Sequence, residues 1–440
     1  MQTRKMNLVA LVIAGPTVHH HGAWRHPESD TNLLDPEWYE HLGRVLEDGK
    51  FDAVFFADFF AVFSSVVGQN KYETILNRGG QLYMLDPLLL LAMISRVTKH
   101  LGLGATMSTT LFKPFQIARA LGSLNLVSDG RVAWNIVTSA SQLEVDNFGT
   151  GKLIPRNERY DRADEVVEAA VALWESWEPD AIVADKETGV WADPSKVHAV
   201  NYKGRWTETA GPLTVPQGPH GHPVLMQAGS SDRGREFAAR WAEVVFTVQH
   251  AQADMRTFYD DLKGRVVQAG RSPEQCSILA CVDPIIGETD AVAREKQSFV
   301  NDLADPEAGL VLLSNHTGVD VSKFPLDQPI RQMELEEGSR GALDILLQAT
   351  QAENLTLREA AKRFGTSLLC PQIVGTPEHV ADQLQEMFET RCCDGFILTP
   401  TQFPGTFEAF TRSVVPILQK RGVFRTEYAG KNLRENLQGG

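Results

Sequence analysis

The stretch GSSDRGREFAARWAEVVFT, residues 229–247, places small polar residues directly before a helical pattern. An apolar run precedes it, so Gly229, Ser230 and Ser231 fall where a strand ends and a helix begins. Such a position suits a phosphate, because the first helical N–H groups lack partners in the helix and the helix dipole is positive there. The alternative is purely structural, with Ser231 or Asp232 acting only as an N-cap.

Polar residues also follow other apolar runs. They are Asp58, Thr106, Ser108, Thr109, Asn135, Thr138 and Ser139. This set is mostly uncharged and rich in hydroxyl and amide groups, which suits hydrogen bonding to a large polar heterocycle. Taken singly, each residue type is also common in turns. Tyr160, near the start of a long helical pattern, could pack on a ring or donate its hydroxyl to a phosphate, or simply contact the core.

Four histidines lie close together in PTVHHHGAWRHP, residues 16–27: His19, His20, His21 and His26. Adjacent histidines in an extended loop cannot all converge on one ion, and their spacing fixes no acidic partner, so we expect no metal site. His20 and His21 are instead candidates for contact with a substrate or a reactive intermediate. The chain has no G-x-S-x-G elbow, Cys–His signature, Walker A motif or dinucleotide glycine pattern.

The elements that must position these residues alternate between short apolar runs and amphipathic stretches. The runs are residues 6–14, 51–58, 101–108, 131–139, 222–229, 243–248, 277–287 and 394–400. Eight strands, each followed by a helix, predict an α/β fold of the (β/α)8 TIM-barrel type with insertion segments. Loops that follow the strands of such a barrel build its active site, so the polar strand ends should share one face.

We interpret residues 1–440 as a single domain with insertions near 59–85, 178–222 and 300–372. The first is a candidate wall of the substrate pocket, the second a hairpin decoration, and the third a mobile lid with helices at 338–351 and 356–365. The polar tail, residues 427–440, is expected to be peripheral or to form a subunit contact.

Bulk composition excludes several functions. The net charge of -14 and the pI near 5.4 argue against a nucleic-acid partner, which needs clustered Lys and Arg. No apolar run approaches the roughly 18 residues of a membrane helix, so we expect no membrane partner and a cytoplasmic location. The five cysteines have no metal-ligand spacing and are interpreted as buried or idle thiols.

Five strings in this order resemble the bacterial luciferase-like flavin monooxygenases: FDAVFFAD, RVAWNIVTS, NFG, RYDRADEVVEAAVALWESW and QAGSSDRGREFAARWAEVVFT. The resemblance covers nearly the whole chain and is to the branch with nitrilotriacetate, EDTA, dibenzothiophene sulfone and long-chain alkane monooxygenases. It implies a barrel, usually dimeric or tetrameric, that binds reduced FMN supplied by a separate NAD(P)H-dependent flavin reductase.

The same resemblance implies roles for the strand-end residues. Isoalloxazine contacts would fall on Asp58, Thr106, Asn135, Thr138 and Ser139, and phosphate contacts on Tyr160, Gly229, Ser230 and Ser231. The implied reaction transfers one oxygen atom from O2 to a small organic substrate through a flavin C4a-(hydro)peroxide. Some members carry a histidine where this chain has Ala140, so no catalytic role is transferred to that position.

Two alternatives stay open: an F420- or FMN-dependent oxidoreductase of the same fold that does not oxygenate, and a flavin-storage protein without turnover. The insertions rather than the barrel set specificity, so the substrate is not identified. Four cations are candidates for pairing with an anionic substrate: Arg78, Lys113, Arg156 and Arg331.

Overall fold

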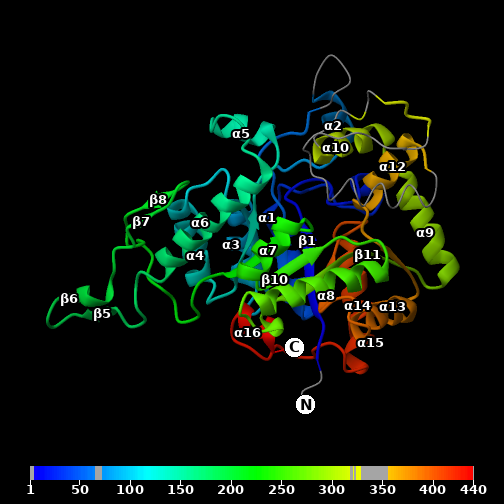
Figure 1. The fold of residues 1–440 in the computed structure, drawn as a ribbon. Helices are drawn as coiled ribbons and strands as arrows, with labels where there is room; N and C mark the ends of the chain where they lie inside the picture. Colours follow the sequence, from blue (N-terminus) through cyan, green and yellow to red (C-terminus); the bar gives the residue numbers. More distant parts are fainter. Residues whose placement is uncertain (1–3, 65–71, 318–320, 322–323, 329–354, 440) are drawn as a thin grey trace.

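Eight parallel strands close into a barrel in the computed structural model, which describes residues 4–64, 72–317, 321, 324–328 and 355–439. The strands are β1 (Asn7–Val12), β2 (Ala53–Phe56), β3 (Gly102–Ser108), β4 (Val132–Val137), β9 (Val224–Ala228), β10 (Val244–Thr247), β11 (Ser277–Ile286) and β13 (Gly395–Leu398). All eight predicted apolar runs supply these strands, so the expected α/β TIM barrel is confirmed (Figure 1).

The barrel closes because β1 pairs with both β2 and β13, while β10 pairs with β11. Its interior is filled by side chains from opposite strands. The rings of Phe55 on β2 and Phe246 on β10 lie 5.1 Å apart, although these strands are not neighbours in the sheet. The barrel is therefore a packed core, and ligands must bind at its mouth.

Helices cover the outside of the barrel. They are α1 (Pro36–Asp48), α3 (Pro87–Val97), α4 (Pro114–Val127), α6 (Arg156–Trp174), α7 (Asp232–Trp241), α8 (Gln252–Gln268), α9 (Asp290–Asp302) and α13 (Pro377–Glu389). Side chains at the expected positions cap several of them; Asp35, for example, accepts a hydrogen bond from the N–H of Glu37 at 3.0 Å, directly before Pro36.

The stretch after β13 forms two consecutive helices, α14 (Gly405–Ser413) and α15 (Val415–Lys420). Pro416 lies in the first turn of α15. Proline has no N–H to donate and is favoured at a helix start, so it begins a new helix rather than continuing the old one.

The segment 178–222 forms two small hairpins, β5 (Ile182–Asp185) with β6 (Val190–Ala192) and β7 (Tyr202–Lys203) with β8 (Glu208–Thr209). The β5–β6 hairpin extends away from the barrel at the left of Figure 1. The expected hairpin decoration is thus confirmed, with an additional short 3-10 helix at Pro194–Lys196.

The other insertions carry further elements: α2 (Glu73–Arg78), α5 (Gln142–Phe148), α10 (Pro306–Thr317), α12 (Leu357–Ser367) and β12 (Gln372–Gly375). Helix α12 matches the helix expected at 356–365, whereas the one expected at 338–351 lies outside the described residues. Helices α10 and α12 share an apolar cluster with Phe63 and Ile75 that is separate from the barrel core.

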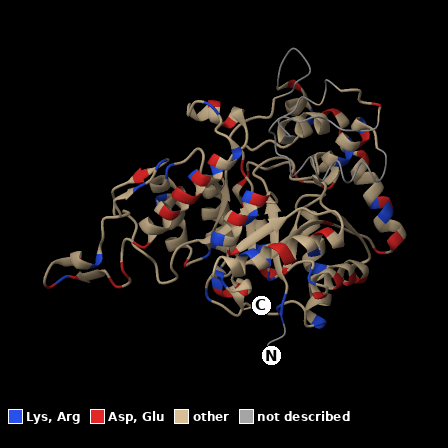
Figure 2. Cartoon of the chain, viewed as in Figure 1, with Lys and Arg blue, Asp and Glu red and all other residues tan. Residues whose placement is uncertain are grey.

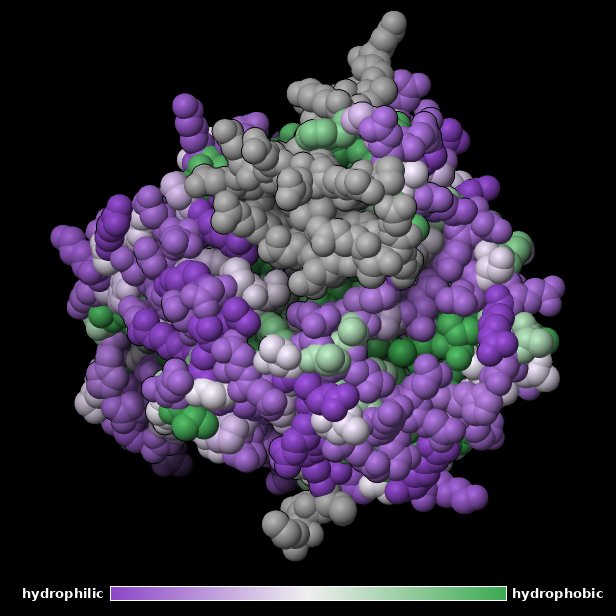
Figure 3. Space-filling model, turned by 45° about the vertical axis from the view of Figure 1, so that its right-hand side comes forward, coloured by the Kyte–Doolittle hydropathy of each residue, from purple (hydrophilic) through white to green (hydrophobic). Residues whose placement is uncertain are grey.

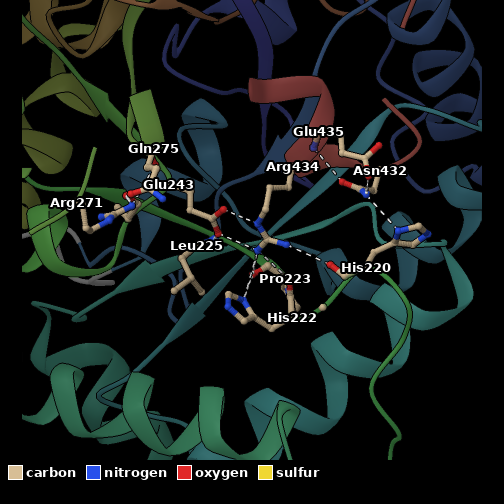
Figure 4. A network of polar contacts seen from close by, with 12 residues as sticks. His220, His222, Pro223, Leu225, Glu243, Arg271, Gln275, Asn432, Arg434 and Glu435 are labelled. Atoms are coloured by element: carbon tan, nitrogen blue, oxygen red, sulfur yellow. Dashed lines mark hydrogen bonds and ion pairs between the residues drawn. The ribbon is translucent and has the colours of Figure 1, made fainter. Parts of the chain in front are cut away.

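The C-terminal tail packs against the rest of the chain, so it is not merely peripheral, while the expected subunit contact stays a prediction. Its helix α16 (Leu433–Gln438) lies at the opposite end of the molecule from α2, α10 and α12 (Figure 1). The Arg434 guanidinium donates to both carboxylate oxygens of Glu243, at 2.5 and 2.9 Å, and to the backbone carbonyl of His220 at 3.2 Å (Figure 4). Leu433 is buried, so this short helix contributes to the core as well.

Charged residues of both signs are intermixed along the outer helices (Figure 2). Arg233 and Arg240 of α7, for example, both pair with Asp164 of α6. The face in Figure 3 is mainly hydrophilic, with small, separate apolar patches. Among the described residues, no helix is both long enough and apolar enough to span a membrane.

Candidate functional site

The turn between β9 and α7 combines a helix cap with groups available to an anion. Ser231 is the N-cap of α7, and its Oγ accepts a hydrogen bond from the N–H of Gly234 at 3.1 Å. The capping interpretation of Ser231 is therefore confirmed. The same hydroxyl retains a proton to donate, and Ser230 beside it is exposed. Capping and anion binding are compatible at this turn.

Tyr160 reaches this turn from α6. A Cβ placed on Gly234 would lie 2.8 Å from the Tyr160 hydroxyl oxygen and 2.9 Å from Ser231 Oγ, so both hydroxyls crowd the same glycine. The Tyr160 ring is buried against Phe237 of α7, with centroids 5.7 Å apart. Packing thus fixes the ring and brings its hydroxyl to the positive end of α7.

Gly229 lies against the side-chain amide of Gln227. A Cβ at this position would meet the side-chain nitrogen of Gln227 at 2.1 Å. The amide oxygen of Gln227 is buried and has no hydrogen-bond partner among the described residues. The end of β9 therefore offers an unused acceptor as well as the helix start.

Thr106 and Asn135 form a connected pair on the neighbouring strands β3 and β4. Asn135 donates from Nδ2 to Oγ1 of Thr106 at 2.9 Å, and Thr106 donates in turn to the backbone carbonyl of Phe56 at 2.9 Å. Both side chains are buried, and Oδ1 of Asn135 has no partner within the described part of the chain. A buried amide oxygen without a partner costs free energy, so it is a natural acceptor for a ligand N–H group.

Asp58 and Ser139 meet around a residue that the sequence analysis missed, Glu144. Ser139 donates to Glu144 at 3.1 Å, and the N–H of Phe60, two residues after Asp58, lies 3.4 Å from the same carboxylate oxygen. Glu144 lies in the first turn of α5, three residues after the N-cap Ser141. This spacing of a serine and a glutamate at a helix start is the only sequence feature that could have pointed to Glu144. Thr138, directly before Ser139, is half-buried.

Two carboxyl groups in this cluster have pKa values raised to near neutral pH. Burial raises the pKa of Asp58 to about 7, with further increases from Asp86 and Glu144, although the N–H of Phe59 opposes the shift. Burial likewise raises the pKa of Glu144 to about 7, against hydrogen bonds from Phe60 and Ser139. Each group can therefore hold or release a proton at physiological pH.

The two candidate histidines form their hydrogen bonds with residues outside the strand-end cluster. His20 accepts at Nδ1 from the N–H of Gly22, and the N–H of His21 donates to the carbonyl of Gly365 in α12 at 2.8 Å. Burial lowers the pKa of His20 to about 4 and lowers the pKa of His21 well below its usual value, so both rings are neutral at physiological pH. Neither ring nitrogen of His21 has a partner among the residues that the structure describes.

Of the cations suggested for an anionic substrate, Arg78 has other partners. Its guanidinium pairs with Asp305 at 3.3 Å and Glu307 at 3.6 Å, which joins α2 to the start of α10. Arg331 lies outside the described residues.

Since all these strand ends are carboxyl ends of parallel strands, they open onto one mouth of the barrel, where enzymes of this fold bind their ligands. A helix N-terminus with convergent hydroxyls shares this mouth with buried amide oxygens and with two carboxyl groups whose pKa values are raised to about 7. Together they place hydrogen-bond donors and acceptors around this mouth, beside a helix start of the kind that suits an anion.

Comparison with known proteins shows the family of the chain. Residues 17–393 match the family model of luciferase-like monooxygenases. The chain is 45% identical to dibenzothiophene-sulfone monooxygenase of Rhodococcus erythropolis, over 99% of this chain and 97% of that protein. It is 38% identical to nitrilotriacetate monooxygenase component A of Aminobacter aminovorans, over 95% and 93% of the two chains. The crystal structure of DmoA from Hyphomicrobium sulfonivorans superposes with a TM-score of 0.91 at 33% identity, over 99% of this chain and 93% of that one.

The chain therefore belongs to the luciferase-like monooxygenase family. The expected family and enzyme class, a flavin-dependent monooxygenase, are confirmed.

Proposed function

We propose that this protein is the oxygenase component of a two-component system, which uses reduced FMN to insert one oxygen atom from O2 into a small organic substrate. The observation that carries the proposal is the convergence of the Tyr160 and Ser231 hydroxyls on Gly234 at the start of α7. This arrangement fits a phosphate ester, and a phosphate distinguishes FMN from riboflavin.

The remaining strand-end residues fit the flavin ring. An isoalloxazine presents both N–H donors and carbonyl acceptors along its polar edge. The unpartnered oxygens of Asn135 and Gln227 can accept from such donors. Thr106, Thr138 and Ser139 supply hydroxyls around them, and the neutral form of Asp58 can donate a proton to a hydrogen bond.

Bound reduced FMN supplies the activation of O2 and the oxygen transfer. The protein's contribution is to bind, orient and exclude water. Ser230, Ser231 and Tyr160 hold the phosphate, Asn135 and Thr106 fix the ring, and the carboxyls of Asp58 and Glu144 hold protons beside it. His20 and His21, both neutral and buried, are the candidates for contact with the substrate.

The proposal includes a partner, a separate NAD(P)H-dependent flavin reductase, since the chain contains no dinucleotide-binding glycine motif. It also includes a homodimer or homotetramer in the cytoplasm. Light scattering on the purified protein measures the mass of the assembly directly.

The decisive experiment combines the protein with FMN, NADH and a generic flavin reductase, and screens candidate substrates for oxygenated products by mass spectrometry. We expect product that depends on substrate, FMN and reductase together. Robust NADH oxidation by this chain alone would contradict the two-component proposal. Turnover only with added F420, without incorporation of oxygen, would favour the non-oxygenating alternative.

A further inference from the structure

Two of the cysteines expected to be buried or idle thiols are buried and meet one of the loop histidines. Cys281 lies on β11, Cys370 lies just before β12, and His19 lies in the loop after β1. The Nδ1 atom of His19 is 3.3 Å from Sγ of Cys370 and 3.9 Å from Sγ of Cys281. All three potential ligand atoms lie within 4.8 Å of one another. We propose that His19, Cys281 and Cys370 form a binding site for one Zn²⁺ ion.

The geometry matches that ion. Zinc binds thiolate sulfur at ~2.3 Å and imidazole nitrogen at ~2.0–2.1 Å in a tetrahedron, so ligand atoms around it lie ~3.5–3.8 Å apart. The two distances to His19 bracket this value, and sub-ångström adjustments of the side chains complete the site. Thiolate and imidazole ligands together select a soft or borderline ion such as zinc rather than Mg²⁺ or Ca²⁺.

A neighbouring carboxylate independently indicates a cation. Asp283 follows Cys281 by two residues on β11, so both side chains point to the same face of the strand. It is buried, and neither carboxylate oxygen has a hydrogen-bond partner among the described residues. A buried carboxyl group without a partner is costly, and a nearby divalent ion with a bound water would satisfy it. The fourth zinc position is assigned to that water.

The site is buried but reachable. Cys281 and Cys370 are almost completely buried, whereas His19 is partly exposed. Cys370 also forms part of the wall of a pocket of about 500 Å³ between α9 and α12, with Gln297, Lys362 and Gln372 among its other lining residues. The three ligands come from widely separated parts of the chain. Bound zinc would therefore link Cys370, just before β12, to β11 and to the loop after β1.

The test uses the full-length protein without flavin, reduced with a phosphine and stripped with a chelator. Zinc is then titrated against a chromogenic chelator. We expect one Zn²⁺ per chain, and a Co²⁺-loaded sample should show sulfur-to-cobalt charge-transfer absorption in the near ultraviolet. Cys281→Ser, Cys370→Ser and His19→Gln should each weaken zinc binding by at least about 100-fold, and Asp283→Asn by about 10- to 100-fold.

The matched control is Cys392→Ser. Cys392 is also buried, but its Sγ lies 3.6 Å from the carbonyl of Gln252, so a serine hydroxyl finds an acceptor there. This variant should bind zinc like the original protein. His19→Gln keeps the inference testable if the cysteine variants do not fold, because His19 lies in a loop. Thermal unfolding should show that zinc raises Tm in the original protein and the control, but not in His19→Gln.

Absence of stoichiometric zinc binding by the reduced protein would overturn the inference. So would equal zinc affinity in the His19→Gln variant and the original protein. If Cys281 and Cys370 form a disulfide and the chain still does not bind zinc after this bond is reduced, the two cysteines are a redox pair and not zinc ligands. Zinc binding is measured without flavin or substrate, so its failure leaves the proposed oxygenase function untouched, and the reverse also holds.

Discussion

The hydroxyl oxygens of Tyr160 and Ser231 approach the same face of Gly234, although one residue comes from α6 and the other from the N-cap of α7. The arrangement joins a structural role, the cap, to the proposed phosphate site within one turn.

The two serines should separate these roles. Ser230→Ala should weaken binding of reduced FMN by roughly 1 kcal/mol, while stability stays unchanged because this side chain is exposed. Ser231→Ala should lose roughly 1–3 kcal/mol of FMN binding and also about 1 kcal/mol of stability, because the cap to Gly234 disappears. Binding titrations and urea unfolding on each variant measure the two effects.

The matched control is Thr289→Ala, which removes the N-cap of α9. It should lose about 1 kcal/mol of stability with no change in FMN affinity. Unaltered FMN affinity in both serine variants would remove the hydroxyls from the phosphate site and leave Ser231 with capping alone.

Gly234→Ala should weaken FMN binding more strongly than either serine change. The new methyl group would meet both hydroxyls at under 3 Å, so Tyr160 and Ser231 must move apart. We expect about a tenfold or larger loss of affinity, equivalent to roughly 1.4 kcal/mol or more. Gly264→Ala in α8 is the control, because nothing lies within 4 Å of its added Cβ. It should raise stability slightly and leave FMN binding unchanged, and equal FMN affinity in the two variants would contradict the prediction.

Asp58 should make stability depend on pH in an unusual direction. Its folded pKa of about 7 is above the value of an unfolded aspartate, so protonation favours the folded state. Its contribution is present at low pH and is lost as pH rises through about 7. Asp58→Asn should therefore gain roughly 2 kcal/mol of stability relative to the original protein on going from about pH 5 to pH 8.

Urea unfolding of both proteins at the two pH values measures this difference. Buried His20 and His21 have lowered pKa values and act in the opposite direction, but they cancel in the comparison. A constant difference between Asp58→Asn and the original protein would refute a raised pKa.

The expected lid near residues 300–372 stays a prediction that hydrogen exchange can test on α10 and α12. These helices share an apolar cluster separate from the barrel core, so they can open without breaking the barrel. Their amides should exchange faster than those of β3 and β4 in the free protein, and more slowly once FMN and substrate are bound. Protection equal to that of the barrel strands, unchanged on ligand addition, would argue against a lid.

The sequence by itself determined the local elements of this protein. Apolar runs of strand length that alternate with amphipathic stretches predicted all eight barrel strands, because burial in a parallel barrel demands apolar side chains on both faces of a strand. The N-cap at Ser231 followed from the same kind of local rule, since a cap bonds to an N–H only three residues away. Strand ends, and with them the predicted flavin-binding residues, could therefore be located without a structure.

Only the tertiary structure decided which distant residues share a site. Nothing near Ser139 signals that Glu144 also lies within 3.4 Å of the N–H of Phe60, because that contact depends on the closure of the barrel. The tail looked peripheral until Arg434 was seen to bind Glu243, 191 residues away. Cys281 and Cys370 meet His19 only because two long connections return to the same barrel mouth. Such contacts arise from long-range packing, which leaves no periodic signal in the local sequence.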